Sequence, residues 1–244
     1  DTTCTAQFKV VRNAESEKLF EDVEGDLYFL AWTTTPWTLP SNTALAVGPS
    51  IEYVRVKCAN PYTGIRQTVI MAKELVPAYF TKKMEGTFTV EERTWKGAEL
   101  AGVRYEQLMD WMRPDGDAFR VITGDYVSVA DGTGIGHIAP TFGADDDRVA
   151  KQAGIAPMLL VDKAGKQQPM VDKQGKMYLL EDLDPEYVKN FVNVEKYAEW
   201  QGRFVKNAYD EKLTEEDATI DVDIAVGLKL ENKAFKIEKH THNY

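Results

Sequence analysis

Short runs of apolar residues, bounded by turn-forming residues, dominate the first half of the chain. In residues 51–57 apolar and polar side chains alternate, as they do in a strand that has one face in the core. Turn sequences such as 60–64 and 113–117 separate the runs. The pattern predicts strands at 26–32, 43–47, 51–58, 65–72, 87–93, 119–123 and 125–129. Many short strands with turns between them favour a barrel or a closed β core.

Helical signals are fewer and lie mainly in the second half. Residues 145–153 predict a helix, because acidic residues occupy its first turn and Gly154 fits a C-terminal cap. Asp184 fits an N-cap and Pro185 the first position of a longer helix. That helix is predicted to reach about Trp200, before Gly202.

Three further segments carry weaker signals. Residues 73–80 predict a short helix. Turn sequences at 162–165 and 172–175 predict a β excursion at about 157–182. Residues 219–231 are apolar at nearly every second position, which by itself is typical of a strand.

Composition narrows the class of protein. The chain has 244 residues, 43% of them hydrophobic and 28% charged, and a formal net charge of −10. This balance argues against a free-standing nucleic-acid-binding domain, since phosphate contacts need Lys and Arg. We find no apolar run long enough to span a membrane and no signal peptide. Two cysteines are too few for a disulfide framework, which favours a cytoplasmic location, and a first residue other than Met suggests an excised piece.

Residues 33–42 form the most informative segment, Thr-Thr-Thr-Pro-Trp-Thr-Leu-Pro-Ser-Asn. Its two prolines exclude a continuing helix or central strand. A rigid loop with several hydroxyl groups suits a small polar ligand and a held water molecule. The alternative is a strand end followed by a threonine-rich turn. If the strand geometry persists, Thr33 and Thr35 face one side and Thr34 the other.

A second segment, residues 132–148, combines glycines with His137 and three consecutive aspartates. Its glycine spacing is not that of a dinucleotide-binding loop. The aspartates Asp145, Asp146 and Asp147 suit a helix N-terminus, where carboxylates are favoured. They point in different directions on a helix, so they do not chelate one metal ion together.

Together the two segments resemble the editing domain, also called CP1, that is inserted in isoleucyl-tRNA synthetase, a class I aminoacyl-tRNA synthetase. That family carries Thr-Thr-Thr-Pro-Trp-Thr-Leu-Pro-x-Asn and, later, Gly-Thr-Gly-x-x-His-x-Ala-Pro-x-x-Gly-x-Asp-Asp, and both are present here in that order. Valyl and leucyl editing domains usually have Arg in place of Thr35. The family often has a second His where this chain has Phe142.

The resemblance implies one editing domain over residues 1–244. Its fold would be a β-rich mixed α/β structure, with a closed, barrel-like β core and peripheral helices. The resemblance also implies that 219–231 is a helix rather than a strand. Residues from about 219 to 244 would then connect the domain back to the rest of the synthetase.

The resemblance also implies roles for individual residues. Asp146 would bind the α-ammonium group of the esterified amino acid, and a carboxylate suits this task because a buried ammonium needs an opposite charge. Thr34, Thr35 and His137 would complete the catalytic group by holding the water and the ester. Whether His137 orients these groups or transfers a proton stays open. Substrate-binding positions, besides Asp146, would be Thr33, Trp37, Asn42, Gly136 and Ile138.

Other residues in the two segments have simpler interpretations. Asp145 and Asp147 are interpreted as structural or solvated. Thr38 and Ser41 are interpreted as turn-stabilising residues. Trp37 is interpreted as a packed rim residue in preference to a platform for stacking bases.

The implied activity is hydrolytic proofreading of Val-tRNA(Ile), with isoleucine excluded by its size and valyl-adenylate as a second candidate substrate. A hydrophobic pocket cannot discriminate strongly on one methylene group, a limit documented for this enzyme family itself. The partners would be the valine-bearing 3′ end of tRNA(Ile) and the rest of an ATP-dependent ligase, with the fragment monomeric and away from membranes. The alternative is a domain that docks the tRNA acceptor end without catalysis.

We expect neither a cofactor nor a metal ion. The ester is already activated, so a positioned water and stabilisation of the developing oxyanion suffice. His240 and His242 lie near the C-terminus without a nearby cysteine or a third convergent ligand, so a zinc site there is not expected.

Overall fold

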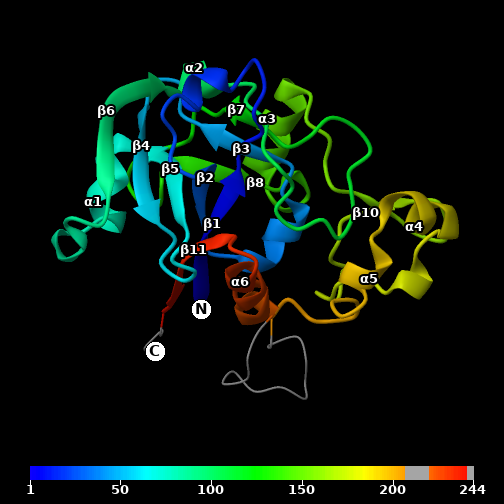
Figure 1. The fold of residues 1–244 in the computed structure, drawn as a ribbon. Helices are drawn as coiled ribbons and strands as arrows, with labels where there is room; N and C mark the ends of the chain where they lie inside the picture. Colours follow the sequence, from blue (N-terminus) through cyan, green and yellow to red (C-terminus); the bar gives the residue numbers. More distant parts are fainter. Residues whose placement is uncertain (207–219, 241–244) are drawn as a thin grey trace.

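The structure of the chain is a computed structural model that describes residues 1–206 and 220–240. His242 and part of the predicted C-terminal connection lie outside these residues. A nine-stranded sheet forms the centre of the molecule, and a separate pair of two-residue strands lies apart from it (Figure 1). The strands are β1 (Thr2–Lys9), β2 (Asp26–Thr33), β3 (Ala44–Val47), β4 (Glu52–Ala59), β5 (Arg66–Ala72), β6 (Thr89–Lys96), β7 (Arg120–Thr123), β8 (Ile135–Ile138), β9 (Leu160–Val161), β10 (Gln167–Gln168) and β11 (Ala234–Lys239).

The large sheet is curled but open, so the predicted closed barrel is wrong. Its strand order is β6-β4-β5-β2-β8-β3-β7, and β1 pairs with both β2 and β11. The edge strands β6 and β7 do not pair with each other. Most of β6 is exposed, and it carries the charged run Glu91-Glu92-Arg93. A charged edge discourages further strand pairing, so the sheet stops at a half-barrel.

Strand β2 lies at the branch point of this sheet. On one side it pairs antiparallel with β1, from Tyr28 to Thr33. On the other side its first half pairs parallel with β5, and Trp32 pairs with Gly136 of β8. Because β2 is held on both sides, the segment that follows it leaves the sheet from a fixed position.

Most of the predicted strands are confirmed, and the exceptions have physical causes. Strands were expected at 26–32, 43–47, 51–58, 65–72 and 119–123, and each coincides with an observed strand; the one expected at 87–93 starts later, at Thr89. The strand predicted at 125–129 is wrong, because the chain turns there and the Val127 amide bonds back to the Gly124 carbonyl. Strand β1 lacks an alternating pattern because both of its faces are buried.

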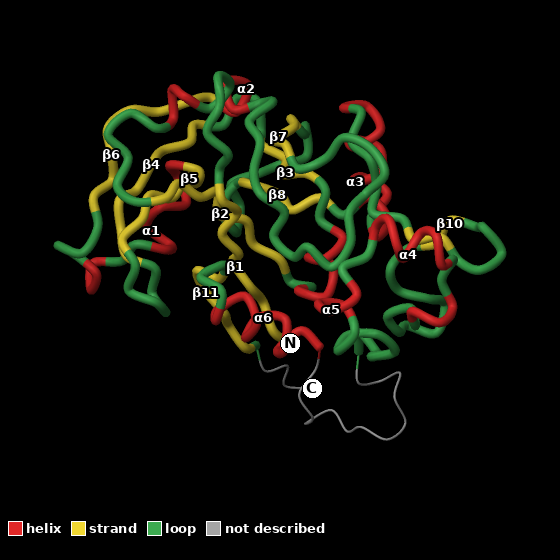
Figure 2. Tube along the Cα trace, turned by 45° about the vertical axis from the view of Figure 1, so that its right-hand side comes forward, coloured by secondary structure: helices red, strands yellow, loops and turns green. Residues whose placement is uncertain are grey.

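The α-helices are short and lie around the sheet. They are α1 (Val76–Tyr79), α2 (Gly97–Leu100), α3 (Ala144–Ala153), α4 (Pro185–Phe191), α5 (Val194–Tyr197) and α6 (Ile220–Leu230), and 3₁₀ helices occur at η1 (Glu17–Leu19), η2 (Pro36–Ser41), η3 (Lys73–Leu75), η4 (Lys82–Met84), η5 (Pro140–Phe142) and η6 (Leu180–Asp182). Figure 2 shows α4 and α5 on one side of the sheet, far from β6 and α1.

Three of the helix predictions are confirmed. The short helix predicted at 73–80 is present as η3 followed directly by α1. Helix α3 ends at Gly154, which has the left-handed φ of 73° expected of a C-terminal cap. Residues 220–230 are helical rather than extended. Ile220, Ile224 and Leu228 lie one helical turn apart and are all buried, so the apolar pattern supports a helix face as well as a strand.

The single helix predicted from Pro185 to about Trp200 is wrong. Asp184 caps its start as expected, because its carboxylate accepts a hydrogen bond from the Tyr187 amide at 3.0 Å. The helix nevertheless ends at Phe191. There Val192 bridges to Met112, and the Asn193 amide bonds to the Trp111 carbonyl at 2.7 Å, so pairing with another segment interrupts the helix.

The predicted turns at 162–165 and 172–175 are present, since Gly165 and Gly175 each donate back to the aspartate three residues earlier. The first turn joins β9 to β10, and Val171 bridges to Met177 around the second. The assignment of residues 1–244 to one editing domain stays a prediction. Among the described residues, no helix has the length and apolar character needed to cross a membrane.

Candidate functional site

A pocket of about 240 Å³ lies where β2 ends, beside the start of α3. Both segments singled out in the sequence contribute to it, although roughly a hundred residues separate them. We call it the threonine pocket. It is lined by Trp32, Thr33, Thr34, Thr35, Thr38, His137, Ala139, Phe142 and Asp146.

The threonine side of the pocket follows from the two prolines. Strand β2 ends at Thr33, Pro36 begins η2 after two further residues, and Pro40 lies inside that short helix. Thr33 and Thr35 face the same side, as the strand period predicts, and their hydroxyl oxygens lie 3.4 Å apart. Thr34 is exposed, yet it also reaches the pocket. All three threonines therefore present hydroxyl groups to one small volume.

The hydrogen bonds around His137 fix its tautomer. Asn42 Nδ2 donates to the Ala44 carbonyl at 2.9 Å, and because a carbonyl only accepts, this identifies the amide nitrogen. The same nitrogen lies 2.8 Å from His137 Nδ1, which must then accept. The proton of the neutral ring is therefore on Nε2, which lies 3.0 Å from the Thr38 hydroxyl and donates to it.

This arrangement keeps His137 neutral. Burial of the ring lowers its pKa to about 4 from the ordinary 6.5. Nδ1 already accepts a hydrogen bond and Nε2 already donates one. His137 therefore orients the Thr38 hydroxyl, whose own proton is directed to the Thr35 carbonyl at 2.8 Å. In this arrangement the imidazole has no free lone pair with which to take a proton from water.

Asp146 supplies the carboxylate of the pocket. It lies in the first turn of α3 and is half-buried, and its Oδ2 accepts a hydrogen bond from the Ala139 amide at 3.0 Å. Burial raises the pKa of Asp146, and the bond from Ala139 opposes that shift only in part. Among the described residues no lysine or arginine forms an ion pair with it. A cationic ligand group would therefore relieve the cost of burying this charge.

The neighbouring aspartates behave differently. Asp145 is exposed and lies 3.6 Å from Arg148, and Asp147 pairs with Lys151 at 2.8 Å. Both pairs are solvent-accessible interactions within α3. This division agrees with the interpretation that, of the three, only Asp146 faces a ligand.

Five of the predicted site residues line the threonine pocket, and four do not. Those that line it are Thr33, Thr34, Thr35, His137 and Asp146. The other four, which do not line it, are Trp37, Asn42, Gly136 and Ile138.

The four outlying residues support the pocket from outside. Trp37 packs edge-on against Phe142 with ring centroids 4.9 Å apart, as a rim residue would. Asn42 is buried and holds His137, while its Oδ1 accepts a hydrogen bond from the Tyr105 hydroxyl at 2.6 Å. Gly136 pairs with Trp32 in the sheet, and Ile138 is buried in a small apolar cluster against α3.

Sequence reasoning did not assign Trp32, Thr38, Ala139 and Phe142 to the pocket, although all four line it. Thr38 does stabilise the turn, but its hydroxyl also accepts a hydrogen bond from His137 Nε2. Ala139 and Phe142 belong to the second motif, and Trp32 immediately precedes the first. Their positions next to the motif residues were the available signal.

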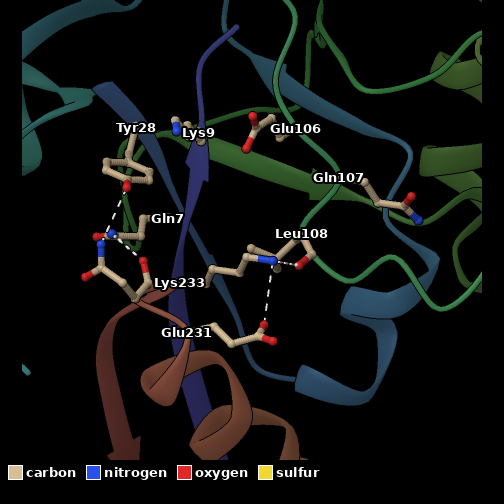
Figure 3. Close-up of a pocket in the computed structure, with 9 residues that line it drawn as sticks. Gln7, Lys9, Tyr28, Glu106, Gln107, Leu108, Glu231 and Lys233 are labelled. Atoms are coloured by element: carbon tan, nitrogen blue, oxygen red, sulfur yellow. Dashed lines mark hydrogen bonds and ion pairs between the residues drawn. The ribbon is translucent and has the colours of Figure 1, made fainter. Parts of the chain in front are cut away.

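A second pocket, of about 210 Å³, lies between β1, β2 and the C-terminal end of α6 (Figure 3). We call it the Gln7 pocket. Lys233 donates to the Leu108 carbonyl at 2.8 Å and lies 3.6 Å from Glu231. Lys9 lies 3.5 Å from Asp26. Both lysines already have anionic or carbonyl partners. Glu106 also lines this pocket; it is exposed to solvent and forms no ion pair with the described residues.

Within the described part of the chain, no three His, Cys, Asp or Glu side chains are grouped so that they could hold a metal ion. The chemistry of the threonine pocket therefore depends on hydroxyl groups, one carboxylate and one neutral imidazole.

The comparisons with known proteins give a consistent result. The chain is 51% identical over its whole length to an isoleucine–tRNA ligase of Porphyromonas gingivalis, and 52% identical to one of Bacteroides fragilis. In each case it spans 22% of the relative's length. No family model matches the chain.

A crystal structure of GlLeuRS-CP1 has a similar fold. It superposes with a TM-score of 0.60, covering 99% of this chain and 100% of the other, at 14% sequence identity. At that identity the likeness concerns the fold alone.

Proposed function

Because the chain belongs, over its whole length, to the isoleucine–tRNA ligase family, we propose that it is the editing domain of such a ligase and hydrolyses the ester of Val-tRNA(Ile). The observation that carries the proposal is Asp146. It is a half-buried carboxylate that faces a hydroxyl-lined pocket and lacks an ion-pair partner among the described residues. An aminoacyl ester presents an α-ammonium group close to its reactive carbonyl, and the pocket offers groups for both.

Asp146 binds the α-ammonium group in this proposal. The contact removes the unfavourable burial of the carboxylate charge and fixes one end of the substrate. The ester carbonyl then lies among the hydroxyl groups of Thr34 and Thr35. Positioning alone accounts for a large part of the rate enhancement when the ester is already activated.

The threonine hydroxyls hold the attacking water and stabilise the developing oxyanion. His137 acts through Thr38, whose hydroxyl it orients, and it transfers no proton itself. A water molecule bound to Thr35 is deprotonated by solvent or by the leaving 3′ oxygen of the adenosine. The proposal therefore requires no metal ion and no cofactor.

Size exclusion is assigned to the apolar walls of the pocket. Trp32, Ala139 and Phe142 are the apolar residues that line the pocket, and Phe142 packs edge-on against Trp37. Valine fits against these walls, while the additional methylene group of isoleucine must displace one of them. Overpacking of this kind is unfavourable in close-packed protein interiors.

The proposed partners are the 3′ end of tRNA(Ile) carrying valine and the rest of the ligase, in the cytoplasm. Valyl-adenylate presents the same ammonium group and acyl carbonyl, and it is proposed as a second substrate. The net charge of −10 makes binding of tRNA by the isolated chain weak and strongly salt-dependent.

A multiple-turnover deacylation assay tests the proposal. Val-tRNA(Ile) and Ile-tRNA(Ile) are each mixed at low salt with the chain, with Asp146→Ala and with the matched control Asp145→Ala. We expect release of valine over many turnovers, little release of isoleucine, loss of activity in Asp146→Ala and normal activity in Asp145→Ala. Binding of both tRNAs without hydrolysis would instead make the chain a docking module. Adding tRNA with a non-acylatable end separates hydrolysis of the adenylate from hydrolysis of the ester.

A further inference from the structure

The 3₁₀ helix η2, which carries Trp37 and Thr38, is capped in an unusual way. The first amide groups of any helix lack a partner inside the helix. A threonine at the N-cap normally supplies one with its own hydroxyl, which accepts from the second or third residue. Thr35 occupies the N-cap of η2, and its side chain makes no capping bond.

The Thr35 hydroxyl is engaged on the pocket side instead. It lies 3.4 Å from the Thr33 hydroxyl and 3.3 Å from the Thr38 hydroxyl. If Thr35 capped its own helix, its hydroxyl would turn away from these neighbours. Capping by Thr35 and presentation of its hydroxyl to the pocket therefore exclude each other.

The missing cap comes from a distant part of the chain. Asp221, in the first turn of α6, accepts a hydrogen bond from the Trp37 amide at 2.8 Å, with its Oδ1 as the acceptor. The two residues are 184 positions apart in the sequence. Helix α6 packs against η2, and its inward face, with Ile220 and Ile224, belongs to the core.

We infer that Asp221 is a positioning residue for the reaction: by capping η2 from α6, it leaves the hydroxyl of Thr35 free to serve the pocket. This inference rests on the proposed function, since it assigns Thr35 and Thr38 to the ester and the water. Asp221 does not line the pocket and acts only through the backbone of η2.

The burial of Asp221 supports this role. The residue is half-buried, and this burial raises the pKa of its carboxyl group to about 6. An exposed residue would cap the helix without this cost. Here the acceptor is directed at a single backbone amide, that of Trp37, which would lose its partner if the carboxylate were removed.

Two substitutions at this position separate positioning from general stability. Asn accepts a hydrogen bond from a helix amide about as well as Asp, so Asp221→Asn is expected to hydrolyse Val-tRNA(Ile) within about three-fold of the wild type. Asp221→Ala removes the acceptor, so Thr35 turns back to cap η2. We expect kcat to fall about 10- to 100-fold, with KM nearly unchanged because Asp146 remains in place.

The matched control is Asp223→Ala on the same helix. Asp223 pairs with Arg203 at 2.5 Å. We expect this variant to lose some thermal stability and to keep the wild-type kcat. An equal loss of kcat in Asp221→Ala and Asp223→Ala, or an equal loss in Asp221→Asn and Asp221→Ala, would overturn the inference.

A second readout keeps the test independent of catalysis. In NMR spectra, Asp221→Ala should move the Trp37 amide and the His137 Nε2 proton signals, because His137 donates to Thr38 of η2. Asp221→Asn and Asp223→Ala should leave the His137 signal in place. If the wild type hydrolyses no ester, the proposed function fails, whereas an unmoved His137 signal in Asp221→Ala overturns the positioning role itself.

Discussion

The threonine pocket and the Gln7 pocket have similar volumes, about 240 and 210 Å³, but they hold their charges differently. In the Gln7 pocket, Lys9 and Lys233 each lie near a carboxylate, and Lys233 also donates to a backbone carbonyl. In the threonine pocket, Asp146 faces hydroxyl groups and lacks an ion-pair partner among the described residues. Glu106 of the Gln7 pocket also lacks an ion pair within the described part of the chain, but it is exposed to solvent, whereas Asp146 is half-buried. Burial makes the charge of Asp146 costly, so a cationic ligand gains more by pairing with it.

The hydrogen-bond networks of the two pockets also lead to different places. Around the threonine pocket the bonds run in sequence from Tyr105 to Asn42 to His137 to Thr38, and each donor has a defined acceptor. In the Gln7 pocket, the side chain of Gln7 exchanges hydrogen bonds with Gln67 and donates to the Asn232 carbonyl. The first network orients hydroxyl groups toward a cavity, and the second joins strands to the end of α6.

The largest effect is expected when a charged side chain is removed from the threonine pocket, and a much smaller one when a charge is removed from the Gln7 pocket. Asp146→Ala should slow the hydrolysis of Val-tRNA(Ile), because it deletes the partner of the ammonium group. The expected loss of transition-state stabilisation is about 2–5 kcal/mol. Lys233→Ala, in the Gln7 pocket, should change the rate by less than about 0.5 kcal/mol. Steady-state deacylation kinetics measure both. Similar losses in the two variants would remove the distinction between the pockets.

Removing the buried amide behind the threonine pocket should have a large effect on stability. Asn42→Ala leaves the Tyr105 hydroxyl, the Ala44 carbonyl and His137 Nδ1 without their partner. The expected loss is roughly 2–4 kcal/mol in the free energy of unfolding. Tyr105→Phe removes only one of these bonds and should cost about 1 kcal/mol. Urea denaturation measures the difference, and equal costs would show that the bonds from Asn42 to Ala44 and His137 add nothing of their own to stability.

The pH dependence of His137 follows from its neutral state. Its pKa in the folded chain is about 4, below the ordinary 6.5, so the unfolded chain binds its proton more tightly. The stability due to the neutral ring is complete above pH 6.5 and is lost as the pH falls from 6.5 toward 4, by about 3 kcal/mol in all. NMR titration of the ring signals should give a midpoint near 4. A midpoint near 6.5 would contradict the assigned hydrogen bonds.

The smallest effect concerns Asp221. Burial lowers the pKa of His137, whereas it raises the pKa of the Asp221 carboxyl group. Its folded pKa of about 6 exceeds the ordinary 3.8, although Lys206 and the N-terminal amino group favour the charged form. The folded chain therefore binds this proton more tightly, and its stability rises as the pH falls from 6 toward 3.8. Asp221→Asn should be more stable than the wild type by roughly 1–2 kcal/mol at pH 7, and the difference should shrink toward pH 4. A constant difference across this range would show that the carboxyl group does not titrate as expected.

The sequence was sufficient for elements whose signal is local. The alternation in 51–57 and the caps at Gly154 and Asp184 depend on neighbouring residues alone, and the structure has the strand and both caps. The closure of the sheet depends on whether two edge strands that are distant in the sequence pair with each other. The charged edge strand β6 does not pair with β7, so the sheet stays open. The end of α4 at Phe191 depends on pairing with Met112 and Trp111, which no local pattern shows.

The same division applies to the threonine pocket. The motif residues Thr33 to Thr35, His137 and Asp146 were found because their types and spacing are distinctive. The role of Thr38 depends on which imidazole nitrogen holds the proton, and that follows only from the position of Asn42. The cap from Asp221 joins residues 184 positions apart, so only the folded chain brings it next to η2.

Calorimetric binding of two non-hydrolysable adenosine conjugates, one valyl and one isoleucyl, tests the central claim most directly. These small ligands avoid the weak binding of tRNA by an acidic chain. The account predicts that the valyl conjugate binds clearly more tightly than the isoleucyl one, and that Asp146→Ala abolishes this binding while Asp145→Ala preserves it. Equal binding of the two conjugates, or valyl binding that survives in Asp146→Ala, would contradict it.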